Sequence, residues 1–449
     1  MRDLSSIVKA YDVRGVVPDQ LDEHVARAVG AAFVRVTGAG RVVTARDMRD
    51  SSAPLAAAFA AGATGQGADV LDAGLGSTDL LYFASGSLGL PGAMFTASHN
   101  PARYNGIKLC RAGAAPVGRD TGLREVRALA EQDLAPAGRQ GTVEQRDLLP
   151  AYAAYLRDLV DLSAIRLLTV VVDAGNGMAG HTVPAVLGHG LPLRIVPLYF
   201  ELDGTFPHHE ANPLEPANLR DLQAKVVEVG ADVGLAFDGD ADRCFVVDER
   251  GEPVSPSAIT ALVAVRALAA NPGATIIHNL ITSRAVPEIV REHGGVPVRT
   301  RVGHSFIKEQ MAETDAVFGG EHSAHYYFRD FWRADTGMLA AMHVLAELGS
   351  ADVPLSRLTA AYRRYAASGE INSTVADVPG RTAAVEEAYA KGDGVDIDHL
   401  DGLTVTLPDG SWFNLRPSNT EPLLRLNVEA RDQAAMIALR DTVLALVRA

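Results

Sequence analysis

Three aspartates stand at alternate positions in the segment FDGDADR: Asp238, Asp240 and Asp242. Carboxylates this close repel one another, and a hard divalent cation, which prefers oxygen ligands, removes that cost. The spacing indicates a Mg²⁺ site, because Mg²⁺ is usually held by a few carboxylates together with a phosphate. A solvated acidic turn is the alternative. A calcium-binding EF-hand loop fits poorly, since Arg243 stands where that loop requires a glycine.

A single hydroxyl, that of Ser98, follows an apolar run in the segment AMFTASHNPARYNGIK. A serine at the end of a strand is usually only a turn or cap residue. Here Asn100 precedes a proline, which favours extended backbone and keeps the turn from continuing as a helix. Lys108 follows an Asn-Gly turn and brings a positive charge back toward the hydroxyl. On these residues alone, a turn residue and a reactive hydroxyl both stay open.

The neighbour of Ser98 raises the question of a serine hydrolase. Successive side chains of extended backbone point in opposite directions, so we expect His99 to be a poor base for Ser98. The Gly-x-Ser-x-Gly motif of the hydrolase elbow is also missing around Ser98. Both observations disfavour a hydrolase.

A second alternating set lies in the segment GGEHSAHYYFRD, where Glu321, Ser323 and His325 would share one side of an extended chain. A carboxylate, a hydroxyl and an imidazole displayed together suit the hydroxyls of a sugar. A zinc site is less natural, because Glu321 is the only acid of the three. A structural hydrogen-bond cluster is the alternative.

A polar loop near the C-terminus, RPSNTEPLLR, carries groups suited to a phosphate. Arg416, Ser418, Asn419 and Thr420 provide a guanidinium, two hydroxyls and an amide in a turn bounded by prolines. Such a turn can surround a phosphate with side-chain and backbone donors. A polar surface turn is the plain alternative.

The elements that must position these residues follow an α/β pattern. Short apolar runs alternate with Ala-rich helical segments, which is typical of mainly parallel sheets. The runs that lead into the serine, aspartate and glutamate segments all end in polar turns, and in open parallel sheets ligands gather at the carboxyl ends of strands. We therefore predict three α/β units that line one cleft, at 1–148, 149–250 and 251–366, and a smaller α+β domain at 367–449.

Composition narrows the class of protein. The 449 residues suggest roughly three domains, and a formal net charge of -14 disfavours nucleic acid as a partner. The two cysteines give no disulfide framework. The N-terminus lacks the apolar core of a signal peptide, and no apolar run approaches the ~20 residues that span a bilayer. We expect a cytoplasmic protein without a membrane partner.

Taken together, the motifs resemble the α-D-phosphohexomutase family, and within it the bacterial phosphomannomutase/phosphoglucomutase group. The segments AYDVRG, TASHNPARYNGIK, DGDADR, VGHSFIK, GGEHSAH and RPSNTEPLLR occur in the order and approximate spacing of that family over essentially the whole chain. The resemblance implies four domains around a central cleft, three of them related α/β units with mixed, mainly parallel sheets.

The resemblance also implies roles for the matching positions. Ser98 would be the phosphoserine of the active enzyme, and an oxygen of its phosphate would join the three aspartates as a ligand of Mg²⁺. Glu321 and Ser323 would bind sugar hydroxyls. The other matching residues fall into a cleft-lining set, Tyr11, Arg14, Lys108, Arg243, His304 and His325, and a phosphate-binding set, Arg416, Ser418, Asn419, Thr420 and Arg425.

The implied reaction interconverts hexose 1-phosphate and hexose 6-phosphate through phospho-Ser98 and a 1,6-bisphosphate. Positioning and charge neutralisation dominate such phosphoryl transfer. We expect Lys108 and His304 to move protons, with Arg14 as an electrostatic aid. Mannose phosphates, and also glucose phosphates, would be substrates, with glucose or mannose 1,6-bisphosphate as activator. We expect a monomer or a homodimer.

Two departures from relatives bear on the substrate. His322 stands where phosphoglucosamine mutases typically carry glutamine, which favours glucose and mannose phosphates over glucosamine phosphate. Ile281 stands where some relatives carry a lysine, so we predict no substrate lysine there. A phosphoglucosamine mutase, a non-catalytic sugar-phosphate-binding protein and a Mg²⁺ phosphatase stay open as alternatives.

Overall fold

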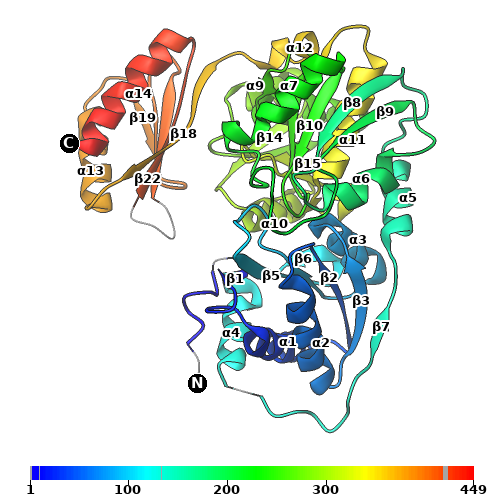
Figure 1. Ribbon diagram of the computed structural model, residues 1–449. Helices are drawn as coiled ribbons and strands as arrows, with labels where there is room; N and C mark the ends of the chain where they lie inside the picture. Colours follow the sequence, from blue (N-terminus) through cyan, green and yellow to red (C-terminus); the bar gives the residue numbers. More distant parts are fainter. Residues whose placement is uncertain (1–2, 10, 133, 418–422) are drawn as a thin grey trace. The chain divides into compact units, whose positions relative to one another are not determined.

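The computed structural model describes residues 3–9, 11–132, 134–417 and 423–449 (Figure 1). The chain forms two compact units. The first unit joins Met1–Pro256 with Ser323–Leu358, and the second joins Ser257–His322 with Thr359–Ala449.

The N-terminal part of the first unit is a mixed sheet with strand order β1-β5-β4-β2-β3-β7, in which β6 pairs with β5. Strands β2, β3, β4 and β7 run parallel, and β5 is antiparallel to both β4 and β1. The strands are β1 (Val13–Val16), β2 (Arg41–Arg46), β3 (Asp69–Leu75), β4 (Gly92–Phe95), β5 (Tyr104–Arg111), β6 (Ala115–Pro116) and β7 (Val143–Gln145).

Helices pack against this sheet (Figure 1). They are α1 (Glu23–Thr37), α2 (Ser52–Gly65), α3 (Thr78–Leu88) and α4 (Arg124–Ala130). Helices α1 and α2 cross closely, because Gly30 and Gly62 leave no side chain between them: a Cβ on Gly62 would lie 1.9 Å from the Arg27 carbonyl oxygen. The rings of Phe33, Phe59 and Phe95 pack in sequence, the first pair tilted and the second edge to face, at centroid distances of 5.9 and 5.4 Å. Each such pair adds about 0.5–1.5 kcal/mol beyond its area burial.

A second sheet of the first unit has the order β12-β11-β10-β8-β9. Strands β8, β9 and β10 are parallel, and β10 turns back into the antiparallel β11. Its strands are β8 (Leu168–Asp173), β9 (Leu193–Leu198), β10 (Val233–Phe237), β11 (Cys244–Asp248) and β12 (Pro253–Val254). Its helices are α5 (Leu149–Leu159), α6 (Ala179–Leu187) and α7 (Arg220–Val229). The same unit contains β16 (Tyr326–Phe328), β17 (Ala334–Asp335), α11 (Gly337–Ser350) and α12 (Leu355–Leu358).

The second unit combines a parallel α/β segment with an antiparallel C-terminal sheet. In the α/β segment, β13 pairs in parallel with β14 and β15. Its elements are α8 (Pro256–Ala270), β13 (Thr275–Asn279), α9 (Ala285–Glu292), β14 (Val296–Thr300), α10 (His304–Thr314) and β15 (Phe318–Gly320).

The C-terminal sheet has the order β18-β22-β21-β20-β19, with every pair antiparallel. Helix α14 packs on β18 and β22, and α13 packs on α14. The elements are β18 (Ala366–Thr374), α13 (Val378–Tyr389), β19 (Asp396–Asp398), β20 (Leu403–Thr406), β21 (Trp412–Pro417), β22 (Leu423–Ala430) and α14 (Gln433–Arg448).

The predicted fold class, mixed and mainly parallel α/β with a smaller α+β segment at the C-terminus, is confirmed. The four-domain division at 1–148, 149–250, 251–366 and 367–449 stays a prediction, and the structure groups these segments into two compact units. Within the described residues, no single helix has both the length and the apolar character of a membrane span, although the bent pair Gly337–Ser350 and Leu355–Tyr362 meets these criteria jointly.

Candidate active site

The loop that carries Ser98 begins where β4 ends, between β2 and β5. Ser98 has a left-handed backbone with φ 51°, a conformation that costs a non-glycine residue energy and needs support from its surroundings. The Thr96 hydroxyl supplies part of that support by accepting a hydrogen bond from the Ser98 amide over 2.9 Å. The side chain is buried, with 5% of the residue exposed. The fold therefore holds one hydroxyl in a defined direction.

The aspartate triplet lies in the turn between β10 and β11, directly opposite this hydroxyl. Asp238, Asp240 and Asp242 are all buried, and Ala241 in their midst takes a left-handed backbone with φ 59°. The Ser98 Oγ donates to Asp238 Oδ2 over 2.8 Å. The ends of β4 and β10 therefore meet, as their parallel-strand setting predicted.

Lys108 reaches the triplet from β5. Its Nζ lies 2.6 Å from Asp240 Oδ2 and 2.6 Å from Asp242 Oδ2. Burial alone would lower the pKa of the Lys108 ammonium, but the two carboxylates outweigh burial and hold that pKa well above its ordinary value. In this arrangement Lys108 supplies a fixed positive charge rather than a free base.

Arg243 supplies a second positive charge. Its Nε and one Nη donate to Asp238 Oδ2 over 2.9 and 2.7 Å, and the same Nη lies 3.3 Å from Ser98 Oγ. The side chain is buried. A phosphate group on Ser98 would therefore lie beside this guanidinium.

The expected orientation of His99 is wrong. Its Nδ1 lies 3.2 Å from Ser98 Oγ and 2.5 Å from an Nη of Arg243, because the left-handed backbone at Ser98 brings both side chains to one side. Burial and the nearby Arg243 lower the pKa of the imidazole well below its ordinary value. His99 is therefore a neutral ring that contacts the hydroxyl.

The donor set of the triplet fits a divalent cation. One carboxylate oxygen from each aspartate can be chosen so that all three lie within 4.8 Å of one another. Within the described part of the chain, Asp240 Oδ1 and Asp242 Oδ1 are buried and have no hydrogen-bond partner. Buried carboxylate oxygens normally find a partner, so these atoms are oriented as free ligands. Burial and the other two aspartates raise the pKa of Asp238 against the effect of Arg243, and a cation would relieve that cost.

The segment with Glu321, Ser323 and His325 is a turn, with Ala324 at φ 64°, and not the extended chain that the alternation predicted. In the first unit, Ser323 Oγ lies 2.9 Å from His325 Nδ1, and His325 Nε2 lies 3.7 Å from Asp242 Oδ1. His325 therefore adjoins the aspartate triplet, and Ser323 adjoins His325.

Glu321 belongs to the second unit and is buried there. Its Oε1 accepts hydrogen bonds from Asn279 Nδ2 over 3.0 Å and from the Gly303 amide over 3.2 Å. His304 is the first residue of α10, directly after Gly303. The strand end of β13 and the start of α10 thus fix the direction of this carboxylate.

Arg14 and Tyr11 come from the N-terminal segment. Arg14, on β1, donates to Asn100 Oδ1 over 2.6 Å and to the Ala97 carbonyl over 3.3 Å, and pairs with Asp12 at 2.5 Å. Arg14 therefore supports the Ser98 loop from the side opposite β2. Tyr11 is partly exposed just before β1.

Two arginines of the predicted phosphate loop lie on neighbouring strands of the second unit. Arg416 on β21 is paired in register with Arg425 on β22. Arg416 lies 3.4 Å from Asp401 and 3.7 Å from Glu370, and Arg425 lies 3.4 Å from Glu370. Ser418, Asn419 and Thr420 lie outside the described residues.

Sequence reasoning missed Thr78, the first residue of α3. Its hydroxyl donates to Asp240 Oδ2 over 2.5 Å, and its amide donates to the Asp240 carbonyl over 3.0 Å. The N-cap Ser77, which accepts from the Leu80 amide, starts the helix at that point. The signal in the sequence was the start of a helix directly after β3. Because β3 runs parallel to β2, its end lies at the same edge of the sheet as the end of β2.

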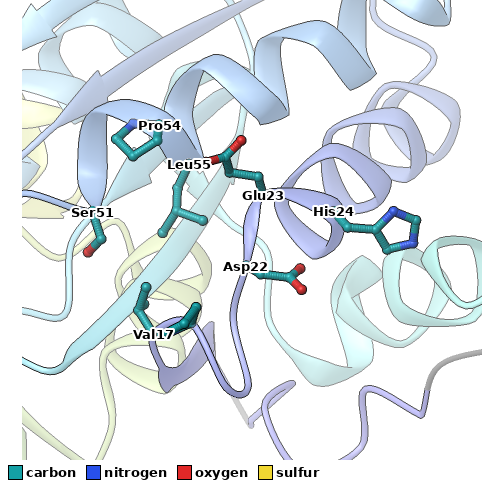
Figure 2. Close-up of a pocket in the computed structure, with 8 residues that line it drawn as sticks. Val17, Asp22, Glu23, His24, Ser51, Pro54 and Leu55 are labelled. Carbon is teal, nitrogen blue, oxygen red and sulfur yellow. The ribbon is translucent and has the colours of Figure 1, made fainter.

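A separate pocket of about 300 Å³ lies between the starts of α1 and α2 (Figure 2). It carries two carboxylates, those of Asp22 and Glu23, and Asp22 already caps α1 by accepting from the Val25 amide. None of the predicted site residues lines it. The lining residues are Val17, Pro18, Asp22, Glu23, His24, Ser51, Pro54 and Leu55.

Comparison with known families agrees with the motifs. Models of the phosphoglucomutase/phosphomannomutase family match four consecutive stretches: alpha/beta/alpha domain I at residues 5–135, domain II at 150–251, domain III at 255–365 and the C-terminal domain at 370–446. The chain belongs to this family. A phosphomannomutase of Escherichia coli is 41% identical and covers 98% of both chains. A phosphohexose mutase of Xanthomonas campestris pv. campestris is 43% identical over 96% of both chains.

Solved structures of the phosphoglucomutase/phosphomannomutase family share the fold. A family protein from Burkholderia thailandensis superposes with a TM-score of 0.89 at 34% identity, covering 99% of this chain and 97% of its own. The predicted family is confirmed, and with it the predicted enzyme class: an isomerase that moves phosphate within a sugar.

Proposed function

We propose that this family member is a Mg²⁺-dependent phosphohexomutase that interconverts the 1- and 6-phosphates of mannose, and also those of glucose. The proposal rests on one observation: a carboxylate of the aspartate triplet and a guanidinium both lie next to the Ser98 hydroxyl. Ser98 Oγ contacts Asp238 Oδ2 at 2.8 Å, with the Arg243 guanidinium at 3.3 Å. A nucleophilic hydroxyl between a cation-binding carboxylate set and a fixed guanidinium suits a phosphoryl carrier.

The proposed reaction uses Ser98 twice. Phospho-Ser98 gives its phosphoryl group to the free hydroxyl of a hexose monophosphate: the bond from phosphorus to Ser98 Oγ breaks, a bond to the sugar oxygen forms, the sugar hydroxyl proton passes to a base, and Ser98 Oγ takes up a proton. The product is a 1,6-bisphosphate. In the return step the bond from its other phosphorus to the sugar oxygen breaks, that phosphorus bonds to Ser98 Oγ, and the serine proton passes to the sugar oxygen, which releases the isomerised monophosphate. Atoms and charges balance over the cycle.

Charge on the transferring group is neutralised by side chains that are already in place. Arg243 lies against Ser98 Oγ, and Lys108 brings its ammonium to the aspartate pair beside it. When bound, Mg²⁺ would be held by Asp238, Asp240 and Asp242 and would add positive charge at the phosphate. Pre-organised charges of this kind cost no reorganisation during transfer.

Proton transfer is assigned to Lys108 and His304. The aspartates hold the Lys108 proton in the arrangement described above. Burial lowers the pKa of this ammonium and the two carboxylates raise it, so a weaker pairing with Asp240 and Asp242 would favour release of the proton. Arg14 is assigned a supporting role, since it contacts the Ser98 loop through Asn100.

Further substrate contacts are proposed from the motifs. Glu321 and Ser323 would bind sugar hydroxyls, and Tyr11, Arg243 and His325 would also contact the substrate. The non-reacting phosphate would bind Arg416 and Arg425 together with Ser418, Asn419 and Thr420. We propose glucose or mannose 1,6-bisphosphate as the activator; a distant family relative, the N-acetylphosphoglucosamine mutase of Aspergillus fumigatus, was solved with glucose 1,6-bisphosphate.

The setting of the enzyme is also a proposal. We propose a cytoplasmic monomer or homodimer whose partner is the hexose phosphate substrate, without a nucleic acid or membrane partner.

Coupled assays on mannose 1-phosphate, glucose 1-phosphate and glucosamine 1-phosphate test the function. Each assay contains a catalytic amount of glucose 1,6-bisphosphate and is repeated after chelation of Mg²⁺. The proposal predicts turnover of the first two sugars, slower turnover of the third, and loss of activity on chelation. Equal or faster turnover of glucosamine 1-phosphate would favour a phosphoglucosamine mutase. Release of free phosphate as fast as isomerisation would favour a phosphatase.

A further inference from the structure

One arginine outside the motifs holds the backbone of the Ser98 loop. Arg49 follows β2, is buried with 2% of the residue exposed, and directs its guanidinium into the loop. Its two Nη atoms donate to backbone carbonyls only. Nη2 reaches the carbonyls of Ser98 and Asn100 at 2.9 and 2.7 Å, and Nη1 reaches those of Pro101 and Tyr104 at 3.0 and 3.1 Å.

Arg49 is itself held in position on both sides. Asp47, at the end of β2, lies 3.2 Å from the Arg49 Nε and accepts the Arg49 amide over 3.0 Å. The Phe206 ring lies 5.0 Å from the guanidinium carbon, a distance typical of a cation–π contact. Gly204 makes that approach possible, because a Cβ there would lie 2.6 Å from the Arg49 Cα.

The Ser98 carbonyl connects the hydrogen bonds from Arg49 to the position of the Ser98 hydroxyl. It accepts from Arg49 on one side, and the backbone of Gly239, within the aspartate turn, lies on the other. A Cβ on Gly239 would lie 2.4 Å from that carbonyl oxygen. Fixing this carbonyl fixes the peptide plane after Ser98, and with it the direction of the Ser98 side chain toward Asp238.

Donating to these four carbonyls requires a planar group with several hydrogen-bond donors. The Pro101 carbonyl also accepts from the Tyr104 amide over 3.0 Å, and Arg49 reaches all four carbonyls from a single group. A guanidinium presents five donors in such a plane, whereas the lysine ammonium presents three donors from one atom. Lysine would retain the charge pair with Asp47 but could not reach all four carbonyls.

We propose that Arg49 is a positioning residue for phosphoryl transfer: through the Ser98, Asn100, Pro101 and Tyr104 carbonyls it holds the serine loop so that Ser98 Oγ faces the aspartate triplet. The inference rests on the proposed function of Ser98. It predicts an effect on turnover that exceeds the effect on binding or on stability.

Arg157 provides a matched control within the same unit. It also donates to three backbone carbonyls, those of Ala185, Val186 and His189, at 2.8 to 3.3 Å. These carbonyls belong to the end of α6 and the loop after it, and not to the Ser98 loop. Replacement of Arg157 by lysine therefore removes comparable hydrogen bonds without changing the support of Ser98.

The experiment compares Arg49→Lys, Phe206→Leu and Arg157→Lys with the unmodified enzyme. For each we measure kcat at saturating bisphosphate, the calorimetric Kd for mannose 6-phosphate, and the melting temperature. Misplacement of a reacting group by about 1 Å costs on the order of 100-fold in rate. We therefore expect Arg49→Lys to lose about 100-fold in kcat with a Kd within about threefold. Phe206→Leu should show a smaller loss of the same kind.

The Arg157 variant and the unmodified enzyme distinguish a failure of the positioning role of Arg49 from a failure of the proposed function. Arg157→Lys is expected to keep its kcat even if its melting temperature falls as far as that of Arg49→Lys. An Arg49→Lys kcat close to that of the unmodified enzyme, or an equal loss in Arg157→Lys, overturns the positioning role. If Arg49→Lys fails to fold, Phe206→Leu decides in the same way. An unmodified enzyme without mutase activity instead overturns the proposed function.

Discussion

The Ser98 hydroxyl donates to the Asp238 carboxylate over 2.8 Å, although 140 positions of sequence separate the two residues. One follows β4 and the other follows β10. Their contact joins the candidate phosphoryl carrier to the candidate cation site within one compact unit.

Replacing Ser98 by alanine removes the proposed phosphoryl carrier. We expect kcat to fall by at least about 10³-fold, as when the nucleophile of a catalytic unit is removed, while the sugar phosphate still binds. Coupled assays and calorimetry measure the two effects. Substantial mutase activity in this variant would assign the transfer to another residue.

Thr78 orients Asp240 by donating to its Oδ2, which leaves Oδ1 free for a cation. Partners that orient a metal ligand are typically worth 10–100-fold in metal affinity. Thr78→Val should therefore raise the Mg²⁺ concentration for half-maximal activity by about tenfold. Thr442→Val, which alters a threonine hydroxyl on the exposed side of α14, is the control. An unchanged Mg²⁺ titration for Thr78→Val would contradict this role.

Asp79 gives the first unit a distinctive pH dependence. Burial raises the pKa of its carboxyl from 3.8 to about 6, against the hydrogen bonds from Ser77, Thr336 and Tyr152. The folded protein therefore binds more protons than the unfolded chain between about pH 4 and pH 6, and stability falls as the pH rises through that window. At 1.36 kcal/mol per pKa unit the loss is about 3 kcal/mol.

Asp79→Asn removes this titration. Its amide oxygen keeps an acceptor for the Tyr152 and Thr336 hydroxyls, which donate to Oδ2, while the Ser77 hydroxyl loses its acceptor at Oδ1. The melting temperature of the variant relative to the unmodified protein should therefore rise between pH 4 and pH 7. Asp161→Asn is the control: the Ser163 backbone amide lowers the pKa of the Asp161 carboxyl below its ordinary value of 3.8, so that carboxyl titrates below about pH 4 and the relative melting temperature of this variant should stay nearly constant between pH 4 and pH 7. A relative melting temperature for Asp79→Asn that is constant over this range would contradict the raised pKa.

Arg416 is assigned to the non-reacting phosphate. A charge-assisted hydrogen bond that is lost equally from substrate and transition state raises KM and leaves kcat nearly unchanged. Arg416→Met should therefore raise KM by about 10- to 100-fold, since a hydrogen bond to a charged group contributes about 1.5–3 kcal/mol. The exposed Arg431, which pairs only with its neighbour Asp432 among the ion pairs of the described residues, gives the control Arg431→Met. A fall in kcat at constant KM would instead place Arg416 in the transfer step.

The sequence was most informative where chemistry depends on spacing along one segment. Three aspartates in five residues indicate a cation site before any fold is known, and strand-end turns indicate which segments meet. The motifs also identified the family, which the comparisons confirm. Periodicity and strand-end polarity therefore predicted the fold class and the meeting of β4 with β10.

Other features depend on backbone angles that the sequence does not display. Extended geometry was assumed at Ser98 and at Ala324, and both are left-handed. As a result His99 lies beside the hydroxyl that it was expected to avoid. Arg49 and Thr78 were missed for a different reason: they act through backbone carbonyls and through another side chain, so neither belongs to a motif of reactive residues.

The phosphorylation state of Ser98 tests the central proposal most directly. Intact and peptide mass spectrometry would be run on the protein after treatment with glucose 1,6-bisphosphate, and again after addition of excess mannose 6-phosphate. We predict one phosphate on Ser98 after the first step, and transfer of that phosphate to the sugar in the second. A protein that binds the bisphosphate but never carries phosphate on Ser98 would contradict the mechanism.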